Sequence, residues 1–178
     1  MSIPNFLSLF RIILVPVTVI FLIDGSFFTA LAIFTLAGVT DALDGFLARV
    51  LSQKTVLGAY LDPLADKALL TSCFVTLSIM GIIPGWLAVV VVSRDFIILL
   101  GISILFMVSV PFEIKPIFVS KVTTAVQIMT VFLALAFKTL GGDGHPLFIH
   151  SLHWLTAGFT IISGFHYLIR GIKAINHS

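Results

Sequence analysis

Long apolar runs alternate with short polar interruptions along this chain, and the pattern predicts six helices. About 20 apolar residues are enough for a helix to cross the hydrocarbon core of a bilayer. Glycine, proline and polar residues interrupt the runs at 24–26, 52–54, 81–85, 110–116 and 141–146. We therefore predict helices over 4–23, 27–50, 60–80, 84–109, 117–138 and 147–170.

Composition places these helices in a membrane. Of the 178 residues, 59% are hydrophobic and 10% are charged, and the mean hydropathy is +1.19. Soluble globular proteins do not have this composition. No stretch is polar enough for a second, soluble domain, so we predict one all-α domain over residues 1–178, a polytopic membrane protein with six transmembrane helices.

The basic residues predict how the helices are oriented. An even number of spans puts both termini on one side, which holds Arg49, Lys54, Lys115, Lys121, Arg170 and Lys173. The opposite loops carry only Lys138. The positive-inside rule then predicts cytoplasmic termini, in a bacterial inner membrane. The N-terminus has no basic region or small-residue cleavage site, so we expect no cleaved signal peptide.

Four aspartates stand out in this apolar chain: Asp41, Asp44, Asp62 and Asp66. Asp41 and Asp44 fall on one face of the predicted helix 27–50, and Asp62 and Asp66 lie one turn apart on the next helix. A short connection makes these two helices antiparallel neighbours. The four carboxylates can therefore converge near the cytoplasmic side.

Converging carboxylates in a membrane need cations. Each costs about 3 kcal/mol near the bilayer centre even on a lenient scale, so an uncompensated cluster is expensive. Oxygen ligands without Cys or His favour Mg²⁺ or Mn²⁺ over zinc, and two divalent ions would offset four negative charges. The small Gly45 and Ala48 would let a phosphorylated ligand approach the helix, and Arg49 offers a planar fork for phosphate oxygens.

The order Asp-x2-Asp-Gly-x2-Ala-Arg-x8-Gly-x3-Asp-x3-Asp, met here without a gap from Asp41 to Asp66, resembles the signature of the CDP-alcohol phosphotransferases. These are integral membrane enzymes of phospholipid synthesis. The resemblance implies that Asp41, Asp44 and Asp62 are metal ligands that hold the diphosphate of a CDP-lipid. It implies that Asp66 is both a ligand and the general base when an acceptor hydroxyl attacks the β-phosphorus and CMP leaves.

The same resemblance outlines the donor site. Its CDP-lipid-binding residues would be Asn5, Gly45, Ala48, Arg49 and Gly58. Arg11 is a further candidate to border the nucleotide pocket. We also expect a homodimer in the lipid bilayer and no nucleic-acid partner, because no basic patch of that kind is present.

Polar residues in two later helices are candidates for the acceptor site: Arg94, Lys115, Ser120 and Lys121. Arg94 and Asp95 lie in mid-helix, where an ion pair that is purely structural and an acceptor site are equally compatible with the pattern. Positive-inside lysines would explain the charges of the second region. They would not explain the polar stripe of Lys121, Thr124 and Gln127, which favours a lipid-phosphate or acceptor site.

Two segments bear on which acceptor is used. VSRDFII and IKPIFVSKVTTAVQ resemble the cardiolipin-forming members of the family more than those that form phosphatidylglycerophosphate, which typically have Ala-Arg-Glu and Gly-Lys-x-Lys-Thr there. The resemblance thus implies transfer from CDP-diacylglycerol to phosphatidylglycerol, giving cardiolipin and CMP. Glycerol 3-phosphate stays open as the alternative acceptor.

Two other classes of function compete with this hypothesis. In the first, the aspartates form a proton or cation pathway, as carboxylates do in transporters; in the second, they belong to a structural scaffold. A pathway does not require Gly-x2-Ala-Arg and Gly58 at fixed offsets from the acids. Release of CMP would exclude a transporter, and a scaffold would tolerate loss of all four acids.

Overall fold

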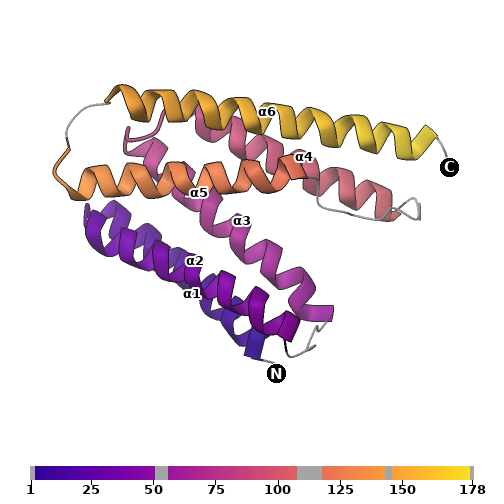
Figure 1. Ribbon diagram of the computed structural model, residues 1–178, viewed down its shortest axis with the longest axis horizontal. Helices are drawn as coiled ribbons and strands as arrows, with labels where there is room; N and C mark the ends of the chain where they lie inside the picture. Colours follow the sequence, from indigo (N-terminus) through magenta and orange to yellow (C-terminus); the bar gives the residue numbers. More distant parts are fainter. Residues whose placement is uncertain (1–2, 51–55, 108–117, 143–145, 177–178) are drawn as a thin grey trace. The chain divides into compact units, whose positions relative to one another are not determined.

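The computed structural model describes residues 3–50, 56–107, 118–142 and 146–176, and side chains within 6–41, 64–101, 119–142 and 146–169. This part of the chain consists of six α-helices and has no strand. They are α1 (Ile3–Ile23), α2 (Phe27–Val50), α3 (Val56–Ile79), α4 (Gly85–Met107), α5 (Phe118–Thr139) and α6 (Leu147–Asn176) (Figure 1). The predicted all-α class and the six helices are confirmed.

Two helix boundaries differ from the prediction. α3 begins at Val56 rather than near residue 60, and α6 continues to Asn176 rather than ending near residue 170. Apolar runs mark the part of a helix that suits the bilayer core, whereas backbone hydrogen bonds can continue into polar residues beyond it. Hydropathy therefore predicts the positions of these helices better than their ends.

Three helices end in the same backbone motif. α1, α3 and α5 are each followed by a glycine with φ near 70°, at Gly25, Gly81 and Gly141. After α1, the Gly25 N–H donates to the Leu22 carbonyl at 2.9 Å, and the Ser26 N–H donates to the Phe21 carbonyl at 2.9 Å. This arrangement satisfies the last carbonyls and requires a left-handed residue, which glycine adopts without strain. The chain turns here, and α2 begins at Phe27.

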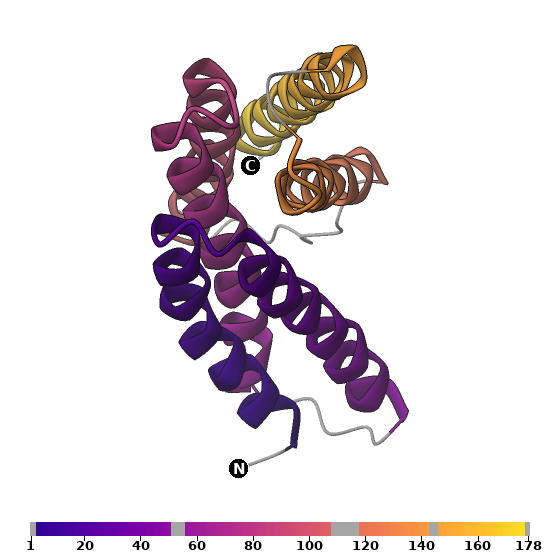
Figure 2. The same ribbon diagram turned by 90° about the vertical axis from the view of Figure 1, so that its left-hand side faces the viewer.

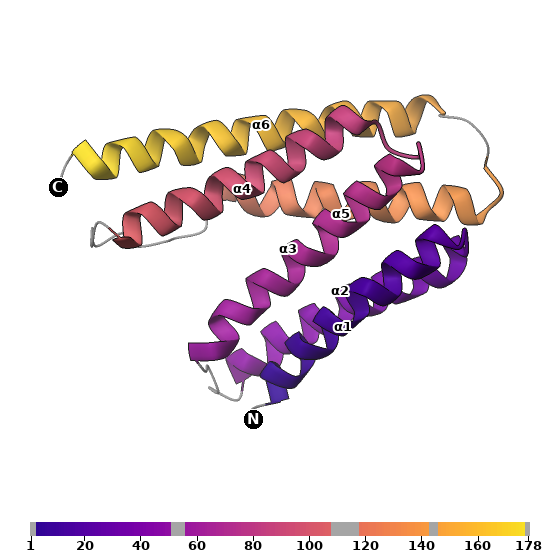
Figure 3. The same cartoon turned by 180° about the vertical axis from the view of Figure 1, so that it is seen from behind.

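The chain forms two compact units. The first comprises Met1–Ile83 and Val131–Gly144, and the second comprises Pro84–Thr130 and His145–Ser178. In the first unit, α1 packs against both α2 and α3, with α3 behind α1 in Figure 2. In the second unit, α4 packs along α6 (Figure 3). A single domain over residues 1–178 stays a prediction.

Polar side chains lie inside the units and many large apolar ones lie outside. Arg11 and Gln127 are 0% and 1% exposed, whereas Ile79 and Leu147 are both 82% exposed. This distribution suits helices in lipid, where apolar side chains contact acyl chains and charged groups turn inward. Within the described residues, the segments Phe6–Ile23 and Val119–Thr139 are long and apolar enough to cross a membrane.

Candidate metal centre

A buried arginine connects two of the four aspartates in the first unit. Arg11 lies on α1 with its side chain 0% exposed, and its Nη1 forms an ion pair with Asp41 Oδ1 at 2.7 Å. The same Nη1 pairs with Asp66 Oδ1 and donates a hydrogen bond to it. Asp41 belongs to α2 and Asp66 to α3, so one guanidinium links all three helices.

The other two aspartates occupy neighbouring positions on the same helices. Asp44 follows Asp41 by three residues on α2, and Asp62 precedes Asp66 by four residues on α3. Residues three or four apart lie on one face of a helix. Both side chains are outside the described part of the structure, so their convergence with Asp41 and Asp66 stays a prediction.

The carboxylates of Asp41 and Asp66 suit a divalent cation. Their side chains are 42% and 39% exposed, so part of each surface is accessible although Arg11 contacts one oxygen of each. Carboxylate oxygens are ligands that Mg²⁺ and Mn²⁺ prefer. No group of three or more His, Cys, Asp or Glu residues forms a metal site within the described side chains. Two of the four predicted ligands, Asp44 and Asp62, lie outside that range.

The predicted donor-site residues are five positions on the first three helices. Their side chains all lie outside the described range: Asn5, Gly45, Ala48, Arg49 and Gly58. Lys115, predicted for the acceptor site, lies entirely outside it. The roles of these six residues stay predictions.

A second buried arginine organises the second unit. Arg94 on α4 is 5% exposed, and its Nη1 donates to Asp95 Oδ1 at 2.6 Å. Its Nη2 donates to Ser120 Oγ on α5 at 2.7 Å and to Ser163 Oγ on α6 at 2.8 Å. The Arg94 guanidinium carbon lies 6.0 Å from the centroid of the Tyr167 ring, at the limit of a cation–π contact. The predicted acceptor residues Arg94 and Ser120 are thus in direct contact.

The predicted polar stripe of α5 divides into an exposed and a buried part. Lys121 is exposed. Gln127 is buried and its Nε2 donates to the Thr160 hydroxyl of α6 at 3.2 Å. The hydroxyl oxygens of Thr130 and Thr156 lie 2.7 Å apart. Polar residues along this part of α5 therefore bind α6, as expected for helices that associate in lipid through small polar side chains.

Sequence reasoning missed the partners that α6 provides. Thr156, Thr160 and Ser163 follow one another at intervals of four and three residues, which puts them on one helix face. That spacing was a visible signal of a polar face. The pairing of Arg11 with Asp41 and Asp66 had no comparable signal, because periodicity within one helix does not say which face of another helix it meets.

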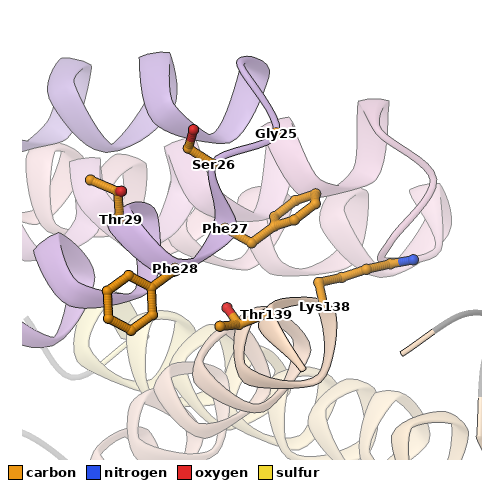
Figure 4. A pocket seen from close by; sticks show the side chains of 7 residues that line it. All are labelled: Gly25, Ser26, Phe27, Phe28, Thr29, Lys138 and Thr139. Atoms are coloured by element: carbon orange, nitrogen blue, oxygen red, sulfur yellow. The ribbon is translucent and has the colours of Figure 1, made fainter. Parts of the chain in front are cut away.

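A cavity of about 340 Å³ lies in the first unit, near the start of α2 and the end of α5. It is lined by Gly25, Ser26, Phe27, Phe28, Thr29, Lys138 and Thr139 (Figure 4). Asp41 lies fourteen residues beyond Phe27 on α2, which corresponds to about 20 Å along the helix axis. The cavity is therefore separate from the aspartates, and none of the predicted site residues lines it.

Comparison with known proteins places these features in a family. Residues 1–162 match the family model of CDP-alcohol phosphatidyltransferases. A Rattus norvegicus protein named cardiolipin synthase (CMP-forming) is 35% identical over 190 residues, which cover 98% of this chain and 63% of the relative. A Mycobacterium tuberculosis protein named probable phosphatidylglycerophosphate synthase is 32% identical over 183 residues, covering 98% of this chain and 83% of the relative.

A third relative has a higher percentage identity over a shorter region. It is the Haemophilus influenzae CDP-diacylglycerol-glycerol-3-phosphate 3-phosphatidyltransferase, 44% identical over 103 residues, or 54% of this chain and 55% of that protein. The chain spans only about three fifths of the length of the rat relative. The family match nevertheless covers most of the chain, including all four aspartates, and this chain belongs to the CDP-alcohol phosphatidyltransferase family.

Proposed function

We propose that this protein transfers the phosphatidyl group of CDP-diacylglycerol to the hydroxyl of phosphatidylglycerol, giving cardiolipin and CMP. The observation that carries the proposal is the meeting of Asp41 and Asp66, from two different helices, at one buried guanidinium. It supports a converging carboxylate site where the family signature expects one. The names of the rat and mycobacterial relatives support phosphatidyl transfer as the reaction class.

In this proposal Asp41, Asp44, Asp62 and Asp66 hold two divalent ions, Mg²⁺ or Mn²⁺. Enzymes of the family depend on divalent metal. When bound, such ions neutralise the charge of the donor diphosphate and orient it for displacement. The donor-binding residues Asn5, Gly45, Ala48, Arg49 and Gly58 would hold the rest of the CDP group, with the small residues allowing close approach and Arg49 contacting phosphate oxygens.

Asp66 is the proposed general base. The acceptor hydroxyl oxygen forms a bond to the β-phosphorus, its proton passes to the Asp66 carboxylate, and the bond from that phosphorus to the bridging oxygen breaks. CMP leaves with the bridging oxygen. A base must approach the hydroxyl to hydrogen-bond distance. The 39% exposure of the Asp66 side chain is compatible with that approach.

The acceptor would lie near Arg94, Lys115, Ser120 and Lys121. Glycerol 3-phosphate carries a dianionic phosphate, whereas phosphatidylglycerol has one phosphodiester charge beside its terminal hydroxyl. Arg94 is already paired with Asp95 and two serine hydroxyls. With Arg94 so paired, Lys115 and Lys121 are the cations of this set left for an acceptor phosphate, a sparse set for a dianion, which favours the monoanionic lipid.

Glycerol 3-phosphate is the second candidate acceptor. The 44% identity over 103 residues to the Haemophilus influenzae protein specifically favours it. The relatives that align over nearly the whole sequence include both a cardiolipin synthase and a probable phosphatidylglycerophosphate synthase, so the choice of phosphatidylglycerol rests on the charges of the proposed acceptor residues.

We further propose that all six helices span a bacterial inner membrane, with both termini and the aspartates on the cytoplasmic side, and that the protein is a homodimer. Two described segments have the length and hydropathy of spans. The asymmetry of lysine and arginine between the two sets of loops supports the orientation.

An acceptor assay tests the proposal. The purified protein, in detergent with Mg²⁺, receives radiolabelled CDP-diacylglycerol with either phosphatidylglycerol or glycerol 3-phosphate, and products are separated by chromatography. We expect labelled cardiolipin as the dominant product. Dominant phosphatidylglycerophosphate would replace the proposed acceptor by the second candidate, and no transfer to either acceptor would overturn both.

A further inference from the structure

We propose that Arg11 is a fixed cation of the metal site, which holds Asp41 and Asp66 together and at the same time weakens the binding of divalent ions to them. The inference rests on the proposed metal site and adds a residue that the family signature does not contain. Its basis is that one buried nitrogen of Arg11 contacts an oxygen of each carboxylate.

The Arg11 side chain has a fixed position in the first unit. Its side chain is fully buried on α1, the helix that packs against both α2 and α3. Removing a buried charge from its ionic partners costs much more than breaking an exposed pair. The positive charge is therefore a permanent part of the site.

This fixed charge has two opposite effects. It reduces the repulsion between Asp41 and Asp66, which stabilises the fold before any ion binds. It also repels a divalent cation that approaches the same carboxylates, and this repulsion is strong because the partly buried site screens charges poorly. The repulsion sets the affinity of the carboxylates for divalent ions, because each ion carries twice the charge of Arg11.

The charge of Arg11 also links metal binding to binding of the donor. Four aspartates and one guanidinium carry three negative charges, so two divalent ions leave an excess of one positive charge. The negatively charged diphosphate of the donor would offset that excess. Arg11 thus makes full occupancy by the second ion depend on the donor being present, which links metal binding to substrate binding.

Thermal unfolding under Mg²⁺ titration tests the inference without any lipid substrate. Purified wild-type protein and Arg11→Met are compared in the same detergent, and the unfolding midpoint is followed as Mg²⁺ is added. We expect Arg11→Met to unfold at a lower temperature without metal. Its half-saturating Mg²⁺ concentration should fall about tenfold, because one opposing charge is removed.

Two further variants separate charge from packing. Arg11→Lys keeps the charge but loses the planar fork, so its midpoint should fall while its half-saturating Mg²⁺ concentration stays near that of the wild type. Lys138→Met is a control that removes another cation of the first unit, one that lines the cavity near the start of α2. This control should leave Mg²⁺ affinity unchanged, because the site lies about 20 Å away along α2.

The outcomes are distinct. An unchanged or higher half-saturating concentration in Arg11→Met would overturn the inference, and so would an Arg11→Lys protein that behaves like Arg11→Met. If Arg11→Met does not fold, Arg11→Gln applies the same test, since its amide can donate to a carboxylate without a charge. A wild type with no Mg²⁺ response would overturn the metal site and this inference together. A normal Mg²⁺ response without phosphatidyl transfer would count against the proposed function alone.

Discussion

The two units each contain a buried arginine, but the arginines have different partners. Arg11 contacts carboxylates from two other helices, and those carboxylates are about 40% exposed. Arg94 contacts the adjacent Asp95, whose side chain is only 10% exposed, and the hydroxyls of Ser120 and Ser163. The acids around Arg11 can still meet further cations, whereas the charge of Arg94 is largely balanced within its unit.

This difference separates a reactive site from a supporting one. A cluster with excess negative charge in an apolar protein attracts cations, and its partial exposure permits entry of a ligand. A buried pair that also donates hydrogen bonds to neighbouring helices mainly fixes helix positions. These differences support the proposal that the phosphotransfer chemistry belongs to the first unit, and we expect Arg94 to act in acceptor binding by holding α4, α5 and α6 in register.

Loss of an aspartate in the first unit should have the largest effect on activity. Asp66→Asn should lower kcat about 10²–10⁴-fold, because the proton acceptor is lost, while the affinity for CDP-diacylglycerol changes much less. Asp41→Asn should abolish transfer, because it removes a metal ligand. Initial rates and equilibrium binding of the donor provide the comparison. Asp24→Asn, at an exposed position after α1, is the matched control. Near-normal turnover by Asp66→Asn would contradict the role of Asp66 as general base.

Loss of Arg94 should have the largest effect on stability. Arg94→Met removes the buried cation that pairs with Asp95, which should lower the free energy of unfolding by about 3–5 kcal/mol. Chemical unfolding in detergent measures this loss. The exposed Lys121→Met should change stability by less than about 0.5 kcal/mol. The double variant Arg94→Met/Asp95→Asn should recover part of the lost stability. If Arg94→Met alone were as stable as the wild type, Arg94 would not hold the second unit together.

Magnesium should distinguish the two arginines. In Arg11→Met, added Mg²⁺ should recover most of the lost unfolding midpoint, because the ions bind the same carboxylates. In Arg94→Met, Mg²⁺ should raise the midpoint only as much as it does in the wild type, so the deficit relative to the wild type should persist at every Mg²⁺ concentration, because Asp95 and the two serines do not belong to the aspartate cluster that binds the ions. Equal recovery of both variants would remove the distinction between the two units.

The hydroxyl pair between α5 and α6 should have the smallest effect. Thr130→Val and Thr156→Val keep side-chain volume and remove the contact between the two hydroxyls, which lie 2.7 Å apart. A double-mutant cycle on unfolding free energy should give a coupling of about 0.6 kcal/mol, as is typical of hydrogen bonds between membrane helices. A coupling near zero would mean that packing alone, without this hydrogen bond, holds these helices.

The sequence predicted the helices well because their hydropathy and their terminating glycines are local properties. The turn at Gly25 follows from one residue that adopts positive φ at the end of an apolar run. It also predicted that aspartates on α2 and α3 meet, since the short loop between these helices leaves few alternatives. For Asp41 and Asp66, the structure brings the carboxylates to a common partner.

Contacts between distant helices were less predictable. Arg11 is separated from Asp66 by 55 positions, and no spacing rule connects a residue of α1 to one of α3. The polar stripe that includes Gln127 favours a lipid-phosphate or acceptor site from sequence, and in the structure Gln127 is buried and donates to Thr160. Polar residues on a membrane helix can serve a ligand or another helix, and only packing distinguishes the two.

Metal-dependent release of CMP is the property on which the proposed function depends, and one measurement tests it directly. CMP formation from CDP-diacylglycerol is followed with phosphatidylglycerol present, first in excess chelator and then as Mg²⁺ is restored. We predict no CMP in chelator, recovery with Mg²⁺, and no recovery in Asp41→Asn. Undiminished CMP release in excess chelator would contradict the assignment of the aspartates as a metal centre.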